Sequence, residues 1–337
     1  MIYRCEHCGE TVNNLDDYEH NQDGWWCECN DYGDLGYFNF FDKHKKPQLK
    51  IFLEDADNGI PIATLPKNQK VKTRLSPFRY PGGKSKLAKF IATLIRQDYN
   101  QVLISPFCGG ASVELGLLDA GIVKKLVLND LDPFVYNVFD CILNRTDALL
   151  SALKQLKIDH DLFTQAKQTV LKQRIEPDCI KRALLTLINN RCSYSGIYYA
   201  GALGGKHGTL TQLTSRFNVE NLVKRIQQIA TMRNDITLLN CDVHDVLQEY
   251  SGCHGTLYLD PPYVKNGPKL YAKNYTELSE HYALLFDVQE NFEELPSDDI
   301  LLFYDNDPFI AQNCCVKPTI LKRRFTANKA MTSTTPD

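Results

Sequence analysis

The stretch TLYLDPPYV at residues 256–264 restricts the possible folds of the chain more than any other segment. Its apolar run, residues 257–259, is bounded by turn signals and predicts a buried strand. The Asp-Pro-Pro-Tyr sequence at residues 260–263 must then form the loop at the carboxyl end of that strand. In open α/β sheets, ligands bind at this end of the strands. The stretch therefore predicts an α/β fold with a binding loop at residues 260–263.

This loop offers hydrogen-bond acceptors and an aromatic face but no nucleophile. Pro261 and Pro262 fix φ and remove two N–H donors, so the carbonyls of Asp260 and Pro261 point outward from a stiff frame. Tyr263 adds a flat ring. The combination suits a ligand that donates two hydrogens and has a π-face, as an exocyclic amine on a nucleobase does. The alternative is a tight Pro-Pro turn with a capping Asp and a packing Tyr.

A strand predicted at residues 102–105 leads into a glycine turn and then into a helix. Phe107, Gly109 and Gly110 belong to this turn, and such a loop lets the backbone approach a cofactor closely. The GxGxxG spacing of nicotinamide-binding proteins is absent. The pattern therefore favours a nucleoside-containing cofactor over a dinucleotide.

Two further predicted strands end in acidic residues. Residues 125–128 lead to Asp130, whose carboxylate can accept hydrogen bonds from ribose hydroxyls. Asp132, which precedes a proline, is instead typical of a helix N-cap. Residues 236–240 lead to Asp242, which can cap the following helix or accept a hydrogen bond from the adenine amine of a cofactor.

Basic residues are concentrated in one short segment. Residues 67–89 carry eight Lys and Arg, including Arg79 and Lys84, and no acid. A Gly-Gly turn followed by apolar residues at helical spacing places Lys84 at the start of a helix, where it can receive an anionic or polar ligand. The P-loop spacing GxxxxGK[ST] is absent. Because the net charge is −3, binding to DNA must depend on such local patches.

Residues 146–192 show three helical patterns, and the glycine-rich segment at residues 193–217 follows them. In this segment Lys206, His207 and Arg216 alternate with tyrosines, which suits a loop that lies against nucleic acid. An ordered surface loop without a ligand is the alternative.

Four of the twelve cysteines form two closely spaced pairs near the N-terminus: Cys5, Cys8, Cys27 and Cys29. Four soft ligands in such pairs can close a tetrahedral zinc site and hold together a module with little core of its own. We therefore predict a zinc-ribbon-like module with structural zinc at residues 1–41. His7 and His20 are candidate substitutes for one thiolate.

Other signals concern location and domain boundaries. No apolar run approaches the roughly 18 residues of a membrane span, and the N-terminus lacks the basic-then-apolar order of a signal peptide. We therefore expect a cytoplasmic protein without a membrane partner. Residues 42–72, with several prolines and the turn-like DADNG, predict a linker that contains a hairpin.

Five motifs occur in the order found in one enzyme family. FRYPGGKSKL, PFCGGASVEL, LVLNDLDPF, LNCDVHDVL and LYLDPPYV resemble motifs X, I, II, III and IV of the Dam-like (alpha-group) DNA adenine-N6 methyltransferases. The resemblance implies an α/β, Rossmann-like domain that uses S-adenosylmethionine, formed by residues 73–144 and 236–329. It also implies a mostly helical target-recognition region at residues 145–235. The cysteine-rich module lies outside the family core.

The resemblance also implies roles for individual residues. The catalytic pocket would consist of Asp260, Pro261, Pro262 and Tyr263. The cofactor would contact Tyr80, Lys84, Phe107, Gly109, Gly110, Asp130, Asp242 and Val243. Double-stranded DNA would contact Arg79, Lys206, His207 and Arg216. The target adenine would flip out of the duplex and stack on Tyr263 while Asp260 and the Pro261 carbonyl accept the hydrogens of its amine.

Two departures from the family pattern leave questions open. Ser105 stands where many relatives have an acid before Pro-Phe, and residues 193–217 do not follow the hairpin pattern of the best-known Dam enzymes. The alternatives are methylation of cytosine N4, methylation of RNA or of a glutamine side chain, and a non-catalytic zinc-containing DNA-binding protein. The sequence leaves open the target site, a partner nuclease in a restriction-modification system, and the oligomeric state.

Overall fold

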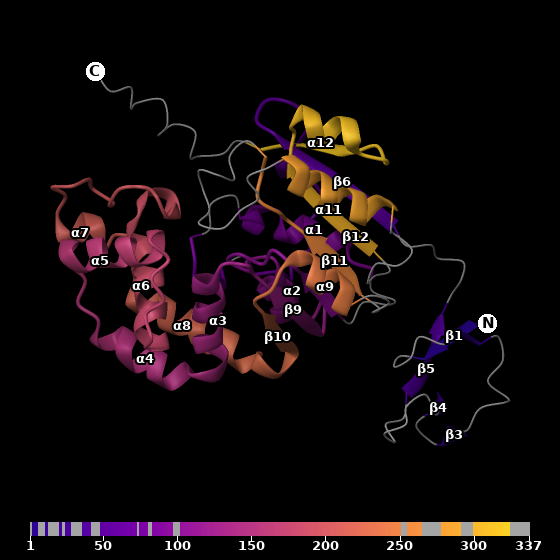
Figure 1. Cartoon of the computed structure of the whole chain (residues 1–337), viewed down its shortest axis with the longest axis horizontal. Coiled ribbons are helices and arrows are strands. Elements are labelled where there is room, and N and C mark those ends of the chain that lie inside the picture. The colour runs from indigo at the N-terminus through magenta and orange to yellow at the C-terminus, as the bar shows by residue number, and fades with distance from the viewer. Residues whose placement is uncertain are drawn as a thin grey trace.

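The computed structural model describes residues 48–72, 74–79, 83–96, 102–250, 255–264, 278–290 and 299–323, together with the backbone of five short strands within residues 1–47. Most of these residues belong to one α/β unit, which Figure 1 shows with a group of helices to one side of it.

An eight-stranded parallel sheet forms the centre of this unit, in the order β10-β9-β8-β11-β12-β6-β13-β7. Its strands are β6 (Gln48–Asp55), β7 (Ile60–Pro61), β8 (Val102–Ser105), β9 (Lys125–Asn129), β10 (Ile236–Leu239), β11 (Thr256–Leu259), β12 (Asp299–Asp305) and β13 (Thr319–Lys322). The chain runs outward from β8 to β10, then returns to the other side of β8 at β11. Ligands bind at this kind of switch point in open α/β sheets.

Helices cover both faces of the sheet. One face carries α1 (Ala88–Leu94), α2 (Glu114–Asp119) and α3 (Pro133–Asn144), and the other carries α9 (Val243–Glu249), α11 (Leu278–Glu290) and α12 (Pro308–Asn313). Alternate residues of β6 enter the two hydrophobic cores: Phe52 on the first face, Ile51 and Leu53 on the second. Burial on both faces explains why the predicted strands are continuous apolar runs. The parallel α/β fold predicted from the sequence is therefore found.

The helices beside the sheet are α4 (Thr146–Gln155), α5 (His160–Leu171), α6 (Cys179–Cys192), α7 (Leu210–Leu213) and α8 (Val219–Thr231), and Figure 1 shows them gathered together with α3. Side-chain caps fix several of their starts. Asp178 accepts hydrogen bonds from two N–H groups of α6, and Asn218 accepts one from Asn221 of α8. Asp132 caps α3, with Pro133 in its first turn, as predicted.

The structure differs from the linker predicted at residues 42–72. Residues 48–55 form β6, which lies inside the sheet between β12 and β13. Seven consecutive residue pairs join β6 to β12, from Gln48 with Asp299 to Glu54 with Asp305. The DADNG sequence is a turn, but it follows this strand: the Asp55 carboxylate accepts hydrogen bonds from the N–H groups of Asp57 and Asn58. The turn signals therefore marked the end of a buried strand.

The five N-terminal strands form a separate sheet in the order β2-β1-β5-β4-β3. They are β1 (Ile2–Cys5), β2 (Thr11–Val12), β3 (His20–Asn21), β4 (Gly24–Cys27) and β5 (Gly36–Phe41). The predicted zinc ligands lie outside the described residues, except for the backbones of Cys5 and Cys27. Among the residues that the structure does describe, no cluster of three His, Cys, Asp or Glu could hold a metal ion, and no helix has the length and apolarity to cross a membrane.

One buried amide joins the helical region to the segment that precedes α1. Asn190 of α6 accepts a hydrogen bond from the Arg79 N–H at 2.8 Å and donates to the Arg79 carbonyl at 3.2 Å. It also donates to the Gly196 carbonyl at 3.2 Å. Gly196 has a φ of +77°, and a Cβ atom there would lie 1.9 Å from the Arg79 carbonyl oxygen. Only glycine fits this crossing.

We expect Gly196→Ala to lower the free energy of unfolding by more than about 2 kcal/mol, because it adds both a clash and a left-handed alanine. Urea titration followed by circular dichroism measures the change. Gly201→Ala is the matched control, since a Cβ atom at Gly201 meets nothing within 4 Å. Its effect should stay within about 0.5 kcal/mol. Equal unfolding midpoints for the two variants would contradict the assignment.

Candidate active site

Asp260 lies directly after β11, at the carboxyl edge of the sheet and beside the switch point. Leu257 and Leu259 of the strand are fully buried and hold the start of the loop in place. The Asp260 side chain is 19% exposed, and its Oδ1 atom accepts a hydrogen bond from Lys84 Nζ at 2.5 Å. The predicted catalytic carboxylate is therefore found where ligands are expected, and part of it reaches solvent.

Tyr263 turns into the protein. It is 3% exposed. Its hydroxyl donates to Glu54 Oε2 at 2.6 Å and accepts from Lys84 Nζ at 2.7 Å. The same ammonium lies 4.8 Å from the centre of the Tyr263 ring. The sequence predicted a stacking face for a flipped base, but in this structure the ring is covered and the hydroxyl is held by charged partners.

Lys84 begins the short helix η2 (Lys84–Lys86), which runs into α1, so its predicted place at a helix start is confirmed. The side chain is only 1% exposed. A buried ammonium needs partners to replace its water. Besides Asp260 and Tyr263, it has Glu54, whose Oε1 atom lies 3.7 Å from Nζ. The residue predicted to contact the cofactor is thus bound to the Asp-Pro-Pro-Tyr loop.

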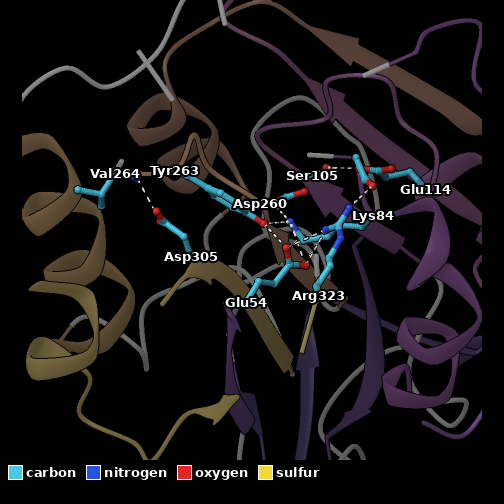
Figure 2. A network of polar contacts seen from close by, with 10 residues as sticks. Glu54, Lys84, Ser105, Glu114, Asp260, Tyr263, Val264, Asp305 and Arg323 are labelled. Carbon is cyan, nitrogen blue, oxygen red and sulfur yellow. Dashed lines mark hydrogen bonds and ion pairs between the residues drawn. The ribbon is translucent and has the colours of Figure 1, made fainter. Parts of the chain in front are cut away.

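Two residues that the sequence analysis did not identify complete this network, which Figure 2 shows. Glu54 ends in a carboxylate with no exposed area. Arg323, directly after β13, donates through Nη1 to both oxygens of that carboxylate, at 2.7 and 2.8 Å, and through Nη2 to the Gly83 carbonyl at 2.8 Å. The sequence did hold a signal for Glu54, because the apolar run at residues 51–53 is followed by acids, as the run at residues 257–259 is followed by Asp260.

Burial has the largest effect on the pKa values of Asp260, Tyr263 and Arg323. It raises the pKa of Asp260, while the Lys84 ammonium acts in the opposite direction. Burial, with the charges of Glu54 and Asp260, also raises the pKa of Tyr263 well above its ordinary value. For Arg323, burial opposes the charge, but Glu54, Tyr263 and Asp260 together outweigh burial and the pKa is raised. The tyrosine hydroxyl therefore remains a donor, and Arg323 remains a cation.

Asp130 follows β9 at the same edge and fixes the glycine turn. Its Oδ2 atom accepts a hydrogen bond from the Gly109 N–H at 2.8 Å, and its Oδ1 atom accepts from the Asp132 N–H at 2.9 Å. Gly109 has a φ of +48°. Burial, and then the charge of Asp132, raise the pKa of Asp130 to about 7. The predicted ribose ligand and the predicted cofactor loop therefore lie in direct contact.

Glu114 supplies a carboxylate next to Ser105, the position where the family resemblance led us to expect an acid. The Ser105 hydroxyl donates to Glu114 Oε1 at 2.8 Å, and both side chains are buried. The pKa of Glu114 is raised to about 7. Burial is the main cause, the Asp260 charge also raises the pKa, and the hydrogen bond from Ser105 lowers it. Glu114 lies in the first turn of α2, nine residues after the expected place of the acid, so alignment of motifs alone did not find it.

The other predicted cofactor residues at this edge are Phe107, Gly110, Asp242 and Val243. Asp242 caps α9, since its Oδ1 atom accepts from the backbone N–H two residues further on, at 3.0 Å. Val243 is 3% exposed and packs in the second core, so its side chain faces away from solvent. Tyr80 lies outside the described residues.

The predicted DNA-contacting residues fall into two groups. Arg79 is partly buried, with Nη1 3.5 Å from the carbonyl oxygens of Arg191 and Ser193. Burial lowers its pKa, and the charge of Arg216 lowers it further, so these two guanidinium groups are close enough to repel. Lys206 and His207 are exposed in the loop before α7. The structure brings Arg79 and Arg216 together at the border between the sheet and the helical region.

The raised pKa of Glu114 predicts a pH-dependent stability. The folded protein binds this proton more tightly than the unfolded chain, so the stabilisation is complete below about pH 4.5 and is lost as the pH rises through about 7. We expect Glu114→Gln to unfold within about 1 kcal/mol of wild type at pH 5 and to be more stable by up to about 3 kcal/mol at pH 8. Urea titrations at both pH values test this, with Glu220→Gln at the exposed start of α8 as control. If the stability of the two variants relative to wild type changes equally between pH 5 and pH 8, the raised pKa of Glu114 is refuted.

Comparison with known proteins agrees with this geometry. Residues 80–310 match the D12 class N6 adenine-specific DNA methyltransferase family. The chain is also similar to the protein named type II methyltransferase M.MjaIII of Methanocaldococcus jannaschii, with 20% identity over 205 residues, 56% of this chain and 69% of the relative. The family match spans more than half of the chain and includes β8 to β12 and the helical region. The chain therefore belongs to the D12 class N6 adenine-specific DNA methyltransferases and is an adenine-specific DNA methyltransferase.

Proposed function

We propose that Asp260, Pro261, Pro262 and Tyr263 form the pocket that holds the N6 amine of the target adenine. The position of Asp260 carries this proposal. Its carboxylate is partly exposed at the end of a central strand, next to the turn that Asp130 and Gly109 hold. An acceptor at this place suits an amine that has to lie near a nucleoside cofactor.

The reaction needs two hydrogen-bond acceptors from the protein and no nucleophile. The lone pair on adenine N6 is delocalised into the ring, so the amine is a weak nucleophile. Acceptance of its two hydrogens by Asp260 and the Pro261 carbonyl favours a pyramidal and more reactive nitrogen. As the nitrogen gains a methyl group it loses one proton, and the Asp260 carboxylate is placed to accept it. In the structure Lys84 donates to one oxygen of that carboxylate, so the amine has to share the carboxylate with Lys84 or take its place.

The residues at the carboxyl edge fit S-adenosylmethionine, which the family implies and which supplies an electrophilic methyl group on its sulfonium. The Asp130 carboxylate is fixed by two backbone N–H groups and keeps lone pairs for ribose hydroxyls. Gly109 and Gly110 allow close approach to the backbone. The buried Glu114 carboxylate lies beside Ser105, near the place where the methionine ammonium would bind. Phe107, Lys84, Tyr80 and the Asp242–Val243 segment would complete the site.

Base flipping forms part of this proposal, because N6 lies inside the duplex. Tyr263 is covered in the structure, so its ring must become accessible when the adenine enters if it is to stack on the base. Arg79, Lys206, His207 and Arg216 are proposed to hold phosphates of double-stranded DNA, with an affinity that falls as salt rises. Residues 145–235 are proposed to read the target sequence, as in the Dam-like subgroup.

We also propose that Cys5, Cys8, Cys27 and Cys29 bind one structural zinc ion. The pairing of the N-terminal strands supports this. β1 and β4 both run antiparallel to β5, and their last residues, Cys5 and Cys27, pair with Phe38 and Gly36 of that strand. Each cysteine pair therefore begins at the same end of the small sheet. Two pairs that begin on either side of β5, at the same end of the sheet, can supply the four ligands of a tetrahedral zinc site.

We expect Asp260→Ala to lower methyl transfer to adenine by at least about 100-fold, because the amine loses its charged acceptor. Incubation with methyl-labelled S-adenosylmethionine and unmethylated duplex DNA, followed by nucleoside analysis, measures the transfer and separates N6-methyladenine from N4-methylcytosine. The dissociation constant for S-adenosylmethionine, measured by calorimetry, should stay within a few fold of the wild-type value. Asp235→Ala, an exposed acid in the helical turn before β10, is the control. Turnover by the Asp260 variant at the wild-type rate would disprove its role.

For the metal, we expect the purified full-length protein to contain about one zinc ion per chain. Plasma mass spectrometry measures the ratio. It should fall close to zero in Cys5→Ser and stay near one in Cys315→Ser, which replaces an exposed cysteine outside the module. Equal zinc content in these two variants would refute the site.

A further inference from the structure

Glu54 is a buried acid at the active site that comes from outside the segment shared with the family. The family match begins at residue 80, whereas Glu54 lies in β6 and its partner Arg323 follows β13. The Glu54 side chain has no exposed area and contacts three functional groups: the hydroxyl of Tyr263, the guanidinium of Arg323 and the ammonium of Lys84.

The charges of this network balance. Glu54 and Asp260 are acids, and Lys84 and Arg323 are bases. Arg323 binds both oxygens of Glu54, an arrangement that fixes the carboxylate in position as well as neutralising it. The Nη2 atom of Arg323 donates to the carbonyl of Gly83, the residue before Lys84. One guanidinium therefore anchors both the backbone from which Lys84 extends and Glu54, beside which Figure 2 shows it.

Lys84 lies between two carboxylates at unequal distances. Its Nζ atom is 2.5 Å from Asp260 and 3.7 Å from Glu54. In this arrangement Lys84 occupies Oδ1, one of the two oxygens that Asp260 can offer to the adenine amine. The lysine side chain is a flexible four-carbon stem, so a movement of Nζ by about 1 Å would exchange its contact with Asp260 for one with Glu54. Without Glu54, release of the ammonium from Asp260 would leave a buried charge without a counter-ion.

We propose that Glu54 is a positioning residue for methyl transfer, which takes over the Lys84 ammonium when Asp260 accepts the hydrogens of the adenine amine, and that Arg323 holds Glu54 in place for this exchange. This inference rests on the proposed role of Asp260. Because its side chain has no exposed area, Glu54 acts through its contacts with Lys84 and Tyr263.

The ionisation of Asp260 gives a signature that a merely structural ion pair would lack. The groups around Asp260 are Lys84, Glu54, Arg323 and Tyr263, with Tyr258 of β11 and Glu114 of α2 nearby. Burial raises its pKa most; Lys84 lowers it, Glu54 raises it and Arg323 lowers it. Neutralising Glu54 should therefore lower the pKa of Asp260, and neutralising Arg323 should raise it.

The experiment compares Glu54→Gln and Arg323→Gln in the full-length protein. Glutamine keeps an acceptor for Tyr263 but removes the charge that Lys84 needs. We expect Glu54→Gln to lower kcat at least tenfold, with the KM for S-adenosylmethionine within about threefold of wild type. The acid limb of the pH profile of kcat should move to lower pH in Glu54→Gln and to higher pH in Arg323→Gln. Asp55→Asn is the control, because this neighbouring carboxylate bonds Asn306 instead of the network.

The double variant Glu54→Gln/Arg323→Gln distinguishes a positioning role from a stabilising one. It removes both charges of the ion pair, so neither residue is left as a buried ion without its partner. We expect it to restore the melting temperature toward wild type while kcat stays low. A double variant with kcat within twofold of wild type, or shifts of the acid limb in the same direction in both single variants, would overturn the inference. If Asp260→Ala loses activity while Glu54→Gln keeps the wild-type activity, this inference is overturned and the proposed function stays intact.

Discussion

Charge neutralisation among Glu54, Lys84, Asp260 and Arg323 is the interaction on which the arrangement of the active site depends. These side chains are largely buried, and an unpaired charge at such a depth costs several kcal/mol. They come from four separate segments of the chain, so neutrality is reached only when the carboxyl ends of β6, β11 and β13 are aligned. The register that pairs Glu54 with Asp305 of β12 provides this alignment. Sheet register and active-site electrostatics therefore depend on each other.

The helical region is tied to the same site through backbone carbonyls. Asn190 and Arg191 of α6 bind the backbones of Arg79 and Pro77, and Arg225 of α8 binds the carbonyl of Ser76. The segment that these side chains hold leads to Gly83 and Lys84. A displacement of α6 would therefore also move residues 77–79, which precede Gly83 and Lys84 in the chain.

The sequence predicted those features whose physical cause is local. The strand at residues 102–105, the Asp132 cap and the helix that begins after Asn218 each follow from a few adjacent residues, and each is present. The Asp-Pro-Pro-Tyr loop was likewise placed correctly after its strand. The orientation of Tyr263 was not predictable from these residues, because it depends on an acceptor in β6 that lies 209 positions earlier. The bond between Glu54 and Arg323 spans 269 positions, and no periodicity or motif carries that information.

The position of β6 also changes where the catalytic domain begins. The sequence predicted a start at residue 73, and the family match starts at residue 80, yet β6 lies between β12 and β13 within the sheet. Phe52 of β6 stacks on Phe303 of β12, with ring centres 4.8 Å apart, so β6 also covers part of the first core. A chain cut at residue 73 would leave β12 as an unpaired edge and Lys84 with Asp260 as its sole carboxylate partner among the described residues. The fold that positions the catalytic loop therefore includes residues 48–55, which sequence similarity alone places outside it.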